Sequence, residues 1–261
     1  MKFFDSHAHY WDLRFASETE AGVDALIEQL LSTTVSGIIN VGTNLETTLL
    51  SIEQAKKHEK MYAIGGVHPG DIPADMSPLA LEDVFLPLFQ APENKLVALG
   101  EIGLDYHYTP FDKKLQMDFF EAQMALAEKL SLPVVIHDRE AHGDCFDMVR
   151  RFPNVRGVFH SYSGSAEMAK ALVSRGYMIS FSGTLTFTNA KKPALVAAAI
   201  PPEMILIETD CPYLAPHPKR GTLNHSGNLV YTNARLSEIL GITPEECAEL
   251  TERNARRVFG L

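Results

Sequence analysis

The 261-residue sequence predicts an α/β protein folded as a single (β/α)8 TIM barrel, and three observations support this prediction. Eight short apolar runs alternate with helical patterns from one end of the chain to the other. These runs are almost continuously hydrophobic, as are strands that are buried on both faces of a parallel sheet. No linker rich in Ser, Gly or Pro divides them, so we expect one barrel domain over residues 1–261.

The apolar runs define the expected strands. Their ranges are 3–8, 37–42, 61–67, 96–102, 133–136, 157–160, 177–181 and 204–208. A doubly wound open sheet would alternate with helices in a similar way. A dinucleotide-binding sheet of that kind needs a glycine-rich turn after its first strand, whereas H-A-H occupies this position here. The barrel is therefore the favoured architecture.

Polar residues that can cap helices precede the helical patterns. Such side chains accept hydrogen bonds from the first turn of a helix. The residues expected to begin helices are Asn44, Ser77, Thr109, Ser165 and Thr243. The first of these helices should run to about residue 58 and the fourth over residues 166–175, while the last opens with the capping box T-P-E-E. Pro193 interrupts a further predicted helix, which should start late or bend there.

Composition and charge exclude several classes of protein. A hydrophobic content of 46% with 21% charged residues is typical of a globular protein and not of a disordered one. No apolar run approaches the roughly 20 residues of a membrane span, and no basic and apolar leader is present. We therefore expect a cytoplasmic protein without a membrane partner. Three widely separated cysteines, Cys145, Cys211 and Cys247, suit reduced thiols better than a disulfide framework.

The net charge of −10 argues against non-specific coating of nucleic acid. It does not exclude a phosphate substrate, because bound divalent cations supply a local positive charge. An acidic protein of this kind is expected to accept a single strand or a strand end in a pocket, and not to grip a long duplex.

Ionisable residues follow the predicted strands at their C-terminal ends, where a barrel carries its active site. A buried histidine or carboxylate there is costly unless it is paired or coordinated, although one alone would be an ordinary hydrogen-bonded core residue. The set is His7, His9, Glu101, His137, His160, Glu208 and Asp210. So many such residues in one topological position indicate a functional site.

The residue types of this set indicate a metal centre. His7 and His9 project to the same face of an extended chain. Imidazole suits Zn, and carboxylate extends the choice to Mg and Mn. The four histidines and the acidic residues exceed what one tetrahedral ion with an open position needs, whereas two ions about 3.5 to 4 Å apart would use them all. Glu101 is the expected bridge, because its strand lies between the other ligand-bearing strands around the barrel.

Other residues near the strand ends are candidates for weaker roles. His68, in G-G-V-H-P, is expected either to contact substrate or to be a hydrogen-bonded loop residue. Arg139 could clamp a phosphate or be a solvated charge, and Arg220 could likewise meet a polyanion or face solvent. Glu208 is expected to orient a ligating histidine. The alternative is that Glu208 shares a proton with Asp210, its close neighbour in the chain.

Several motifs, in their order and spacing, resemble those of the TatD family of metal-dependent deoxyribonucleases, which belongs to the amidohydrolase-like TIM barrels. They are F-D-S-H-A-H, G-V-H-P, G-E-I-G-L-D-Y, V-V-I-H-D-R, F-H-S-Y-S-G-S and E-T-D-C-P-Y-L-A-P, and together they span essentially the whole chain. The resemblance implies a first divalent ion held by His7, His9, Glu101 and Asp210. It implies a second held by Glu101, His137 and His160. It also implies that Asp210 orients or deprotonates the attacking water.

One segment departs from the family pattern. Family members often carry R-G-x-x-N-x-P after the last strand, and this chain reads R-G-T-L-N-H-S-G from Arg220 to Gly227. Arg220, Gly221 and Asn224 match, but the proline is absent and the loop over residues 219–228 is longer. The departure concerns substrate preference more than reaction type.

The expected function is hydrolysis of DNA phosphodiester bonds, at single strands or strand ends, by a water that two Mg, Mn or Zn ions activate. Asp210 and Glu101 are the expected catalytic residues. DNA or another phosphodiester is the expected partner of a monomer that needs no other protein.

Two alternatives remain open at this point. The same barrel could hydrolyse a small amide, lactone or ester, but such hydrolases often bridge their metals with a carbamylated lysine where this chain has Glu101. A metal-binding protein without catalysis would carry an incomplete ligand set, and this set is complete.

Overall fold

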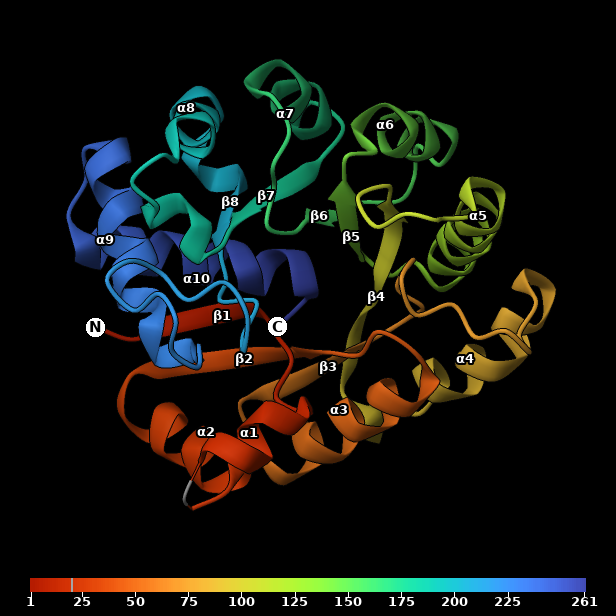
Figure 1. Cartoon of the computed structure of the whole chain (residues 1–261), viewed down its shortest axis with the longest axis horizontal. Coiled ribbons are helices and arrows are strands. Elements are labelled where there is room, and N and C mark those ends of the chain that lie inside the picture. The colour runs from red at the N-terminus through yellow and green to blue at the C-terminus, as the bar shows by residue number, and fades with distance from the viewer. Residues whose placement is uncertain (20) are drawn as a thin grey trace.

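The computed structural model describes residues 1–19 and 21–261, with the side chain of Glu18 left aside. Eight parallel strands form one sheet in chain order, and helices surround them (Figure 1). The strands are β1 (Phe3–Ala8), β2 (Val35–Val41), β3 (Met61–Gly65), β4 (Leu96–Asp105), β5 (Val134–Arg139), β6 (Gly157–Phe159), β7 (Tyr177–Phe181) and β8 (Ile205–Ile207). The predicted (β/α)8 barrel is confirmed.

Helices lie outside the sheet of the barrel, and all but the last two are in connections between successive strands. They are α1 (Leu13–Glu18), α2 (Val23–Thr33), α3 (Leu45–Lys57), α4 (Leu81–Gln90), α5 (Lys113–Leu130), α6 (His142–Arg151), α7 (Ala166–Val173), α8 (Lys191–Ala199), α9 (Leu229–Leu240) and α10 (Pro244–Phe259). No helix in the described ranges is long and apolar enough to cross a membrane.

The strands are buried on both faces, which explains their continuous hydrophobicity. Inside the barrel, Phe4, Ile64, Val135 and Leu206 belong to one buried cluster, and Phe259 of α10 joins it. Helix α10 packs against β1 and β8 and crosses the barrel (Figure 1). Because Phe4 lies near the start of β1, α10 covers the end of the barrel opposite to the strand ends that carry the ionisable residues.

The barrel closes between β8 and β1 through a short seam. The backbone nitrogen of His9 donates to the carbonyl oxygen of Cys211 (2.8 Å), and that of Asp210 donates to the carbonyl oxygen of His7 (2.9 Å). The buried carboxylate of Asp5 adds to the seam, because it accepts hydrogen bonds from the backbone nitrogen of Thr209 (3.0 Å) and from its hydroxyl. The seam therefore sets how the predicted metal ligands of the two strands face each other.

Most of the predicted helix starts are confirmed. Asn44, Ser165 and Thr243 cap α3, α7 and α10, and the last is the predicted capping box. Ser77 caps the 3-10 turn Pro78–Ala80 that leads into α4. Helix α8 begins at Lys191, so Pro193 lies in its first turn, in agreement with the predicted late start.

Several predictions about element boundaries are wrong, and three of them bear on the site. The helix expected from Thr109 begins at Lys113, because the carboxylate of Asp112 caps it by accepting from the backbone nitrogen of Leu115 (2.9 Å). Strands β4 and β5 continue beyond the predicted ends at residues 102 and 136, up to Asp105 and Arg139, which pair with each other. The two strands end in polar residues that line a cavity, Asp105 in β4 and residues 137–139 in β5, so apolar character does not mark their ends.

Candidate metal centre

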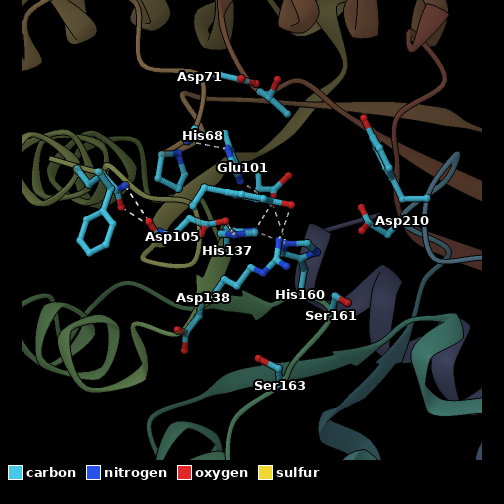
Figure 2. Close-up of a pocket in the computed structure, with 18 of the residues that line it drawn as sticks. His68, Asp71, Glu101, Asp105, His137, Asp138, His160, Ser161, Ser163 and Asp210 are labelled. Atoms are coloured by element: carbon cyan, nitrogen blue, oxygen red, sulfur yellow. Dashed lines mark hydrogen bonds and ion pairs between the residues drawn. The ribbon is translucent and has the colours of Figure 1, made fainter. Parts of the chain in front are cut away.

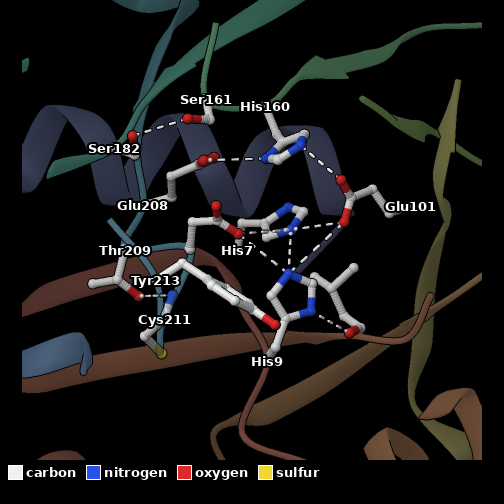
Figure 3. Close-up of polar contacts among 12 residues, drawn as sticks. His7, His9, Glu101, His160, Ser161, Ser182, Glu208, Thr209, Cys211 and Tyr213 are labelled. Carbon is white, nitrogen blue, oxygen red and sulfur yellow. Dashed lines mark hydrogen bonds and ion pairs between the residues drawn. The ribbon is translucent and has the colours of Figure 1, made fainter. Parts of the chain in front are cut away.

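The predicted ligands converge at the C-terminal end of the barrel (Figures 2 and 3). His7 and His9 come from the end of β1, and Glu101 comes from the middle of β4. His137 lies on β5, His160 directly follows β6, and Asp210 follows β8. All six side chains meet within one group of ion pairs and close contacts. The six are His7, His9, Glu101, His137, His160 and Asp210.

Glu101 lies between two pairs of histidines. Its Oε2 atom is 3.3 Å from His7 Nε2 and 3.8 Å from His9 Nε2. Its Oε1 atom is 2.9 Å from His137 Nδ1 and 2.8 Å from His160 Nε2. Each carboxylate oxygen therefore faces one pair, which is the geometry that a bridging ligand requires.

The nitrogens within each pair of histidines are very close together. His7 Nε2 and His9 Nε2 are 3.1 Å apart, and His137 Nδ1 and His160 Nε2 are 3.2 Å apart. Two nitrogens that each lie about 2.1 Å from the same ion are about 3.0 to 3.4 Å from each other, for an angle at the ion between a right angle and the tetrahedral one. Both pairs thus have the spacing of ligands on a shared cation, and the donor set of imidazoles and carboxylates fits a divalent ion.

The outer nitrogens of three of these four histidines are held by acceptors. Ligating histidines usually donate their second ring N–H to a carbonyl or carboxylate, which turns the other nitrogen toward the metal. The contacts are His9 Nδ1 to the Val41 carbonyl oxygen (2.8 Å), His137 Nε2 to Asp105 Oδ2 (3.0 Å) and His160 Nδ1 to Glu208 Oε1 (3.3 Å). In each case the inner nitrogen is left to bind a cation. The remaining Nδ1, that of His7, is buried without a hydrogen-bond partner among the described residues.

Glu208 and Asp105 support histidines in the same way. The structure places Glu208 beside His160, where it can orient this histidine, which is the first of the two roles considered for it from the sequence. Asp105 was not singled out from the sequence, because the predicted strand ended before it. A signal was available, since residues four apart on a strand face the same side and Asp105 follows Glu101 at that spacing.

Asp210 approaches the first pair of histidines from the seam. Its Oδ1 atom is 3.2 Å from His9 Nε2 and 3.8 Å from His7 Nε2. Its backbone is left-handed, with φ at 55°. The buried Asn224 holds this turn, because its Nδ2 donates to the carbonyl oxygens of Thr209 (2.9 Å) and Tyr213 (2.7 Å). The asparagine shared with the family pattern thus shapes the loop that carries Asp210.

The carboxylates of the site are held in the ionised form. Burial alone would raise the pKa of Glu101, but His160 and His7 outweigh it and hold this pKa well below its usual range. Burial is likewise outweighed at Asp210, where His9 lowers the pKa. Both groups therefore carry the negative charge that a cation needs.

The centre opens into a cavity of about 1140 Å³. The large aromatic side chains Tyr108, Phe111 and Tyr213 line it and remain 67%, 38% and 44% exposed. Arg139 and Lys192 contribute positive charge to the same lining. The cavity thus combines partly exposed aromatic rings, cations and further carboxylates around the predicted ligand residues.

Two of the three residues predicted to contact substrate line the cavity, and the third does not. His68 and Arg139 both line the cavity, and Arg139 Nη1 donates to the Tyr108 hydroxyl (3.1 Å). Arg220 is not among the residues that line this cavity, and its guanidinium lies 4.1 Å from the ring centroid of Phe187. The structure therefore brings two of the three predicted contacts to the centre.

Comparison with known proteins identifies the family. A family model described as TatD related DNase matches residues 4–260. A Bacillus subtilis protein named "Uncharacterized metal-dependent hydrolase YabD" is 36% identical over 99% of both chains, and Escherichia coli K12 YcfH, with the same description, is 33% identical over 100% of this chain and 97% of its own. The solved structure of YJJV, a TatD homolog from Escherichia coli K12, has a TM-score of 0.90 at 27% identity, over 99% of this chain and 98% of that one. This chain belongs to the TatD family and is a metal-dependent hydrolase built on a TIM barrel.

Proposed function

We propose that this hydrolase cleaves phosphodiester bonds of DNA, at single strands or strand ends, with two divalent ions of Mg, Mn or Zn. The position of Glu101 carries the proposal, because its two oxygens face two separate pairs of closely spaced histidines. A centre for one catalytic ion needs only three protein ligands, whereas six side chains converge here.

The ligand residues divide between two positions that share Glu101. The first would be held by His7, His9, Glu101 and Asp210. The second would be held by Glu101, His137 and His160. Two divalent ions, when bound, would stabilise negative charge on the phosphoryl and leaving oxygens and lower the pKa of a water.

Asp210 is the residue that would accept the proton of the attacking water. Its carboxylate is ionised, and its side chain is 16% exposed toward the cavity, against 4% for Glu101. A general base must be in hydrogen-bond reach of the water that it deprotonates. The more accessible carboxylate is therefore the base, and the enclosed one is the bridge.

The cavity lining supports a nucleic acid strand as the substrate. Exposed aromatic rings stack on bases of any sequence, and Tyr108, Phe111 and Tyr213 offer such rings. Arg139 and Lys192 can meet the phosphates that flank those bases. The family description as a DNase supports the same reaction. A concave pocket with these groups suits a strand end that can enter it.

The test is one assay on the metal-reconstituted protein. End-labelled single- and double-stranded DNA are compared with a panel of amides, lactones and esters. Wild-type protein should release nucleotides, and Glu101→Ala should not. Glu249→Ala, the same substitution at an exposed position of α10, should cleave like the wild type. Turnover of a lactone or amide without release of nucleotides would refute the proposal.

A further inference from the structure

The imidazole of His68 is oriented differently from the other histidines of the centre. Its Nδ1 atom lies 2.9 Å from the backbone nitrogen of Gly70, two residues further along the loop after β3. A backbone N–H can only donate, so Nδ1 is the acceptor. A Cβ atom at Gly70 would lie 3.2 Å from His68 Nδ1, closer than most Cβ contacts, so glycine leaves this approach unhindered.

This hydrogen bond determines the tautomer of His68. An imidazole with one accepting nitrogen is neutral and carries its single hydrogen on the other nitrogen. Nε2 of His68 is therefore an N–H group that faces the centre. His9 is the opposite case, since its Nδ1 donates to the Val41 carbonyl oxygen and its Nε2 keeps a free lone pair. A nitrogen that carries hydrogen does not ligate a cation, so His68 is not one of the metal ligands.

The Nε2–H group of His68 faces the side of the centre formed by β5 and β6. It lies 3.6 Å from Glu101 Oε1, the oxygen that also contacts His137 and His160 (Figure 2). The rings of His68 and His137 meet edge to face, with 4.4 Å between centroids. A separation of 3.6 Å is too long for a hydrogen bond. Within residues 1–19 and 21–261, this N–H thus has no protein acceptor, although its side chain is only 18% exposed.

An oriented donor without a protein acceptor, at the edge of a cavity, is prepared for an oxygen of a ligand. We propose that His68 is a catalytic residue that donates a hydrogen bond from Nε2 to a phosphoryl oxygen of the substrate. This inference rests on the proposed phosphodiester hydrolysis and adds a neutral donor beside the metal ligands. The N–H is already aimed before substrate arrives, so its contribution grows as charge develops on the phosphoryl group.

The first test examines the metal-free protein. Nitrogen-15 NMR of histidine-labelled protein distinguishes a protonated ring nitrogen from an unprotonated one. The His68 signals are assigned as those that disappear in His68→Gln. We expect an unprotonated Nδ1 and a protonated Nε2 near neutral pH. A ring protonated at Nδ1, or at both nitrogens, would overturn the inference.

The second test measures the affinity of the metal-loaded protein for inorganic phosphate by calorimetry. His68→Ala should keep the wild-type metal content and bind phosphate about 10- to 100-fold more weakly, as expected for one hydrogen bond to a charged group. His68→Gln, whose side-chain amide can donate from a similar position, should recover most of the loss. His107→Ala is the matched control, because His107 contacts Glu140 at the surface and does not line the cavity.

Three results of this measurement would contradict the inference. The first is the loss of one metal equivalent in His68→Ala. The second is an affinity of His68→Ala for phosphate that equals the wild-type affinity. The third is a His68→Gln variant that binds phosphate as weakly as His68→Ala. Failure of the proposed function is distinguishable from these. If DNA is not cleaved but phosphate binding follows the expected pattern, the function is wrong and His68 still binds an oxyanion. If His68→Ala cleaves DNA at the wild-type rate, His68 is not catalytic and the function stands.

Discussion

The two halves of the candidate metal centre are supported in different ways. The β1–β8 half consists of His7, His9 and Asp210, and the β5–β6 half consists of His137 and His160. Both use Glu101. In the β5–β6 half, both histidines donate to buried carboxylates. These are Asp105 and Glu208.

The β1–β8 half depends on the backbone instead. His9 donates to a main-chain carbonyl oxygen, and Asp210 is held by a turn that Asn224 fixes through two other carbonyl oxygens. A carboxylate behind an imidazole raises its basicity as well as orienting it, whereas a carbonyl oxygen supplies orientation without a full charge. Metal affinity should therefore depend on side-chain charge in the β5–β6 half and on barrel closure in the β1–β8 half.

Glu101→Ala should have the largest effect, because it removes the ligand that the two halves share. We expect loss of metal from both halves and a decrease in kcat/KM of more than about 10³-fold, beyond the usual cost of removing one stabilising donor. Metal analysis and steady-state kinetics measure the two effects. Retention of both ions would show that the halves are independent and that Glu101 is not their bridge.

Asn224→Ala should separate the halves by damaging the seam. Two buried carbonyl oxygens would lose their donor, so the free energy of unfolding should fall by about 2 to 4 kcal/mol. The metal affinity of the β1–β8 half should decrease, and that of the β5–β6 half should stay unchanged. Denaturant titration and metal-binding isotherms measure this, with the exposed Asn154→Ala as control. Equal weakening of both ions would mean that the seam does not define one half alone.

Asp105→Asn should weaken metal binding in the other half, the β5–β6 half. Oδ1 of Asp105 accepts from the backbone nitrogen of His107 (2.9 Å), so an asparagine that keeps this bond turns its amide NH2 toward His137 Nε2. The imidazole would then carry its hydrogen on Nδ1, the nitrogen that faces Glu101. Metal affinity of the β5–β6 half should fall about 10- to 100-fold.

Asp105→Asn should leave the metal affinity of the β1–β8 half unchanged. The control is Asp118→Asn, at a partly exposed position of α5, which should change the metal affinity of neither half. Competition with a metal chelator measures each affinity. A loss confined to the β1–β8 half would reverse the comparison between the halves.

The smallest expected effect is a pH dependence of folding stability that comes from Asp5 in the seam. Burial raises the pKa of Asp5 from 3.8 to about 6, despite its hydrogen bonds with Thr209. The folded protein then binds more protons than the unfolded chain between these two values. Stability should therefore fall as the pH rises from about 4 to about 6, by at most about 1.4 kcal/mol per pH unit.

Asp5→Asn should remove this part of the slope in denaturant titrations of the metal-free protein. Asp105→Asn should leave it unchanged, because hydrogen bonding with His137 outweighs burial and holds the pKa of Asp105 at about 2, below this range. If Asp5→Asn keeps the full slope, another group in the protein is responsible for it.

Local patterns were sufficient to predict the barrel and the convergence of its metal-site residues. Apolar runs followed by His, Glu or Asp identify both a buried strand and its functional end, because parallel strands of one barrel present their C-terminal ends together. His7, Glu101, His137 and Asp210 could be singled out in this way. Asp105 was missed because the apolar run stops before it, although β4 continues.

Residue type and spacing are thus enough to specify the fold and which residue types meet at one end of it. The three-dimensional contacts were needed to show which oxygen of Glu101 faces which pair of histidines, that Arg220 lies over Phe187, and that His68 presents N–H and not a lone pair. The physical reason is that these properties depend on contacts between distant segments, or on the orientation of one ring toward a backbone N–H. Side-chain orientation and tautomer are set by such contacts, and residue type and spacing do not specify them.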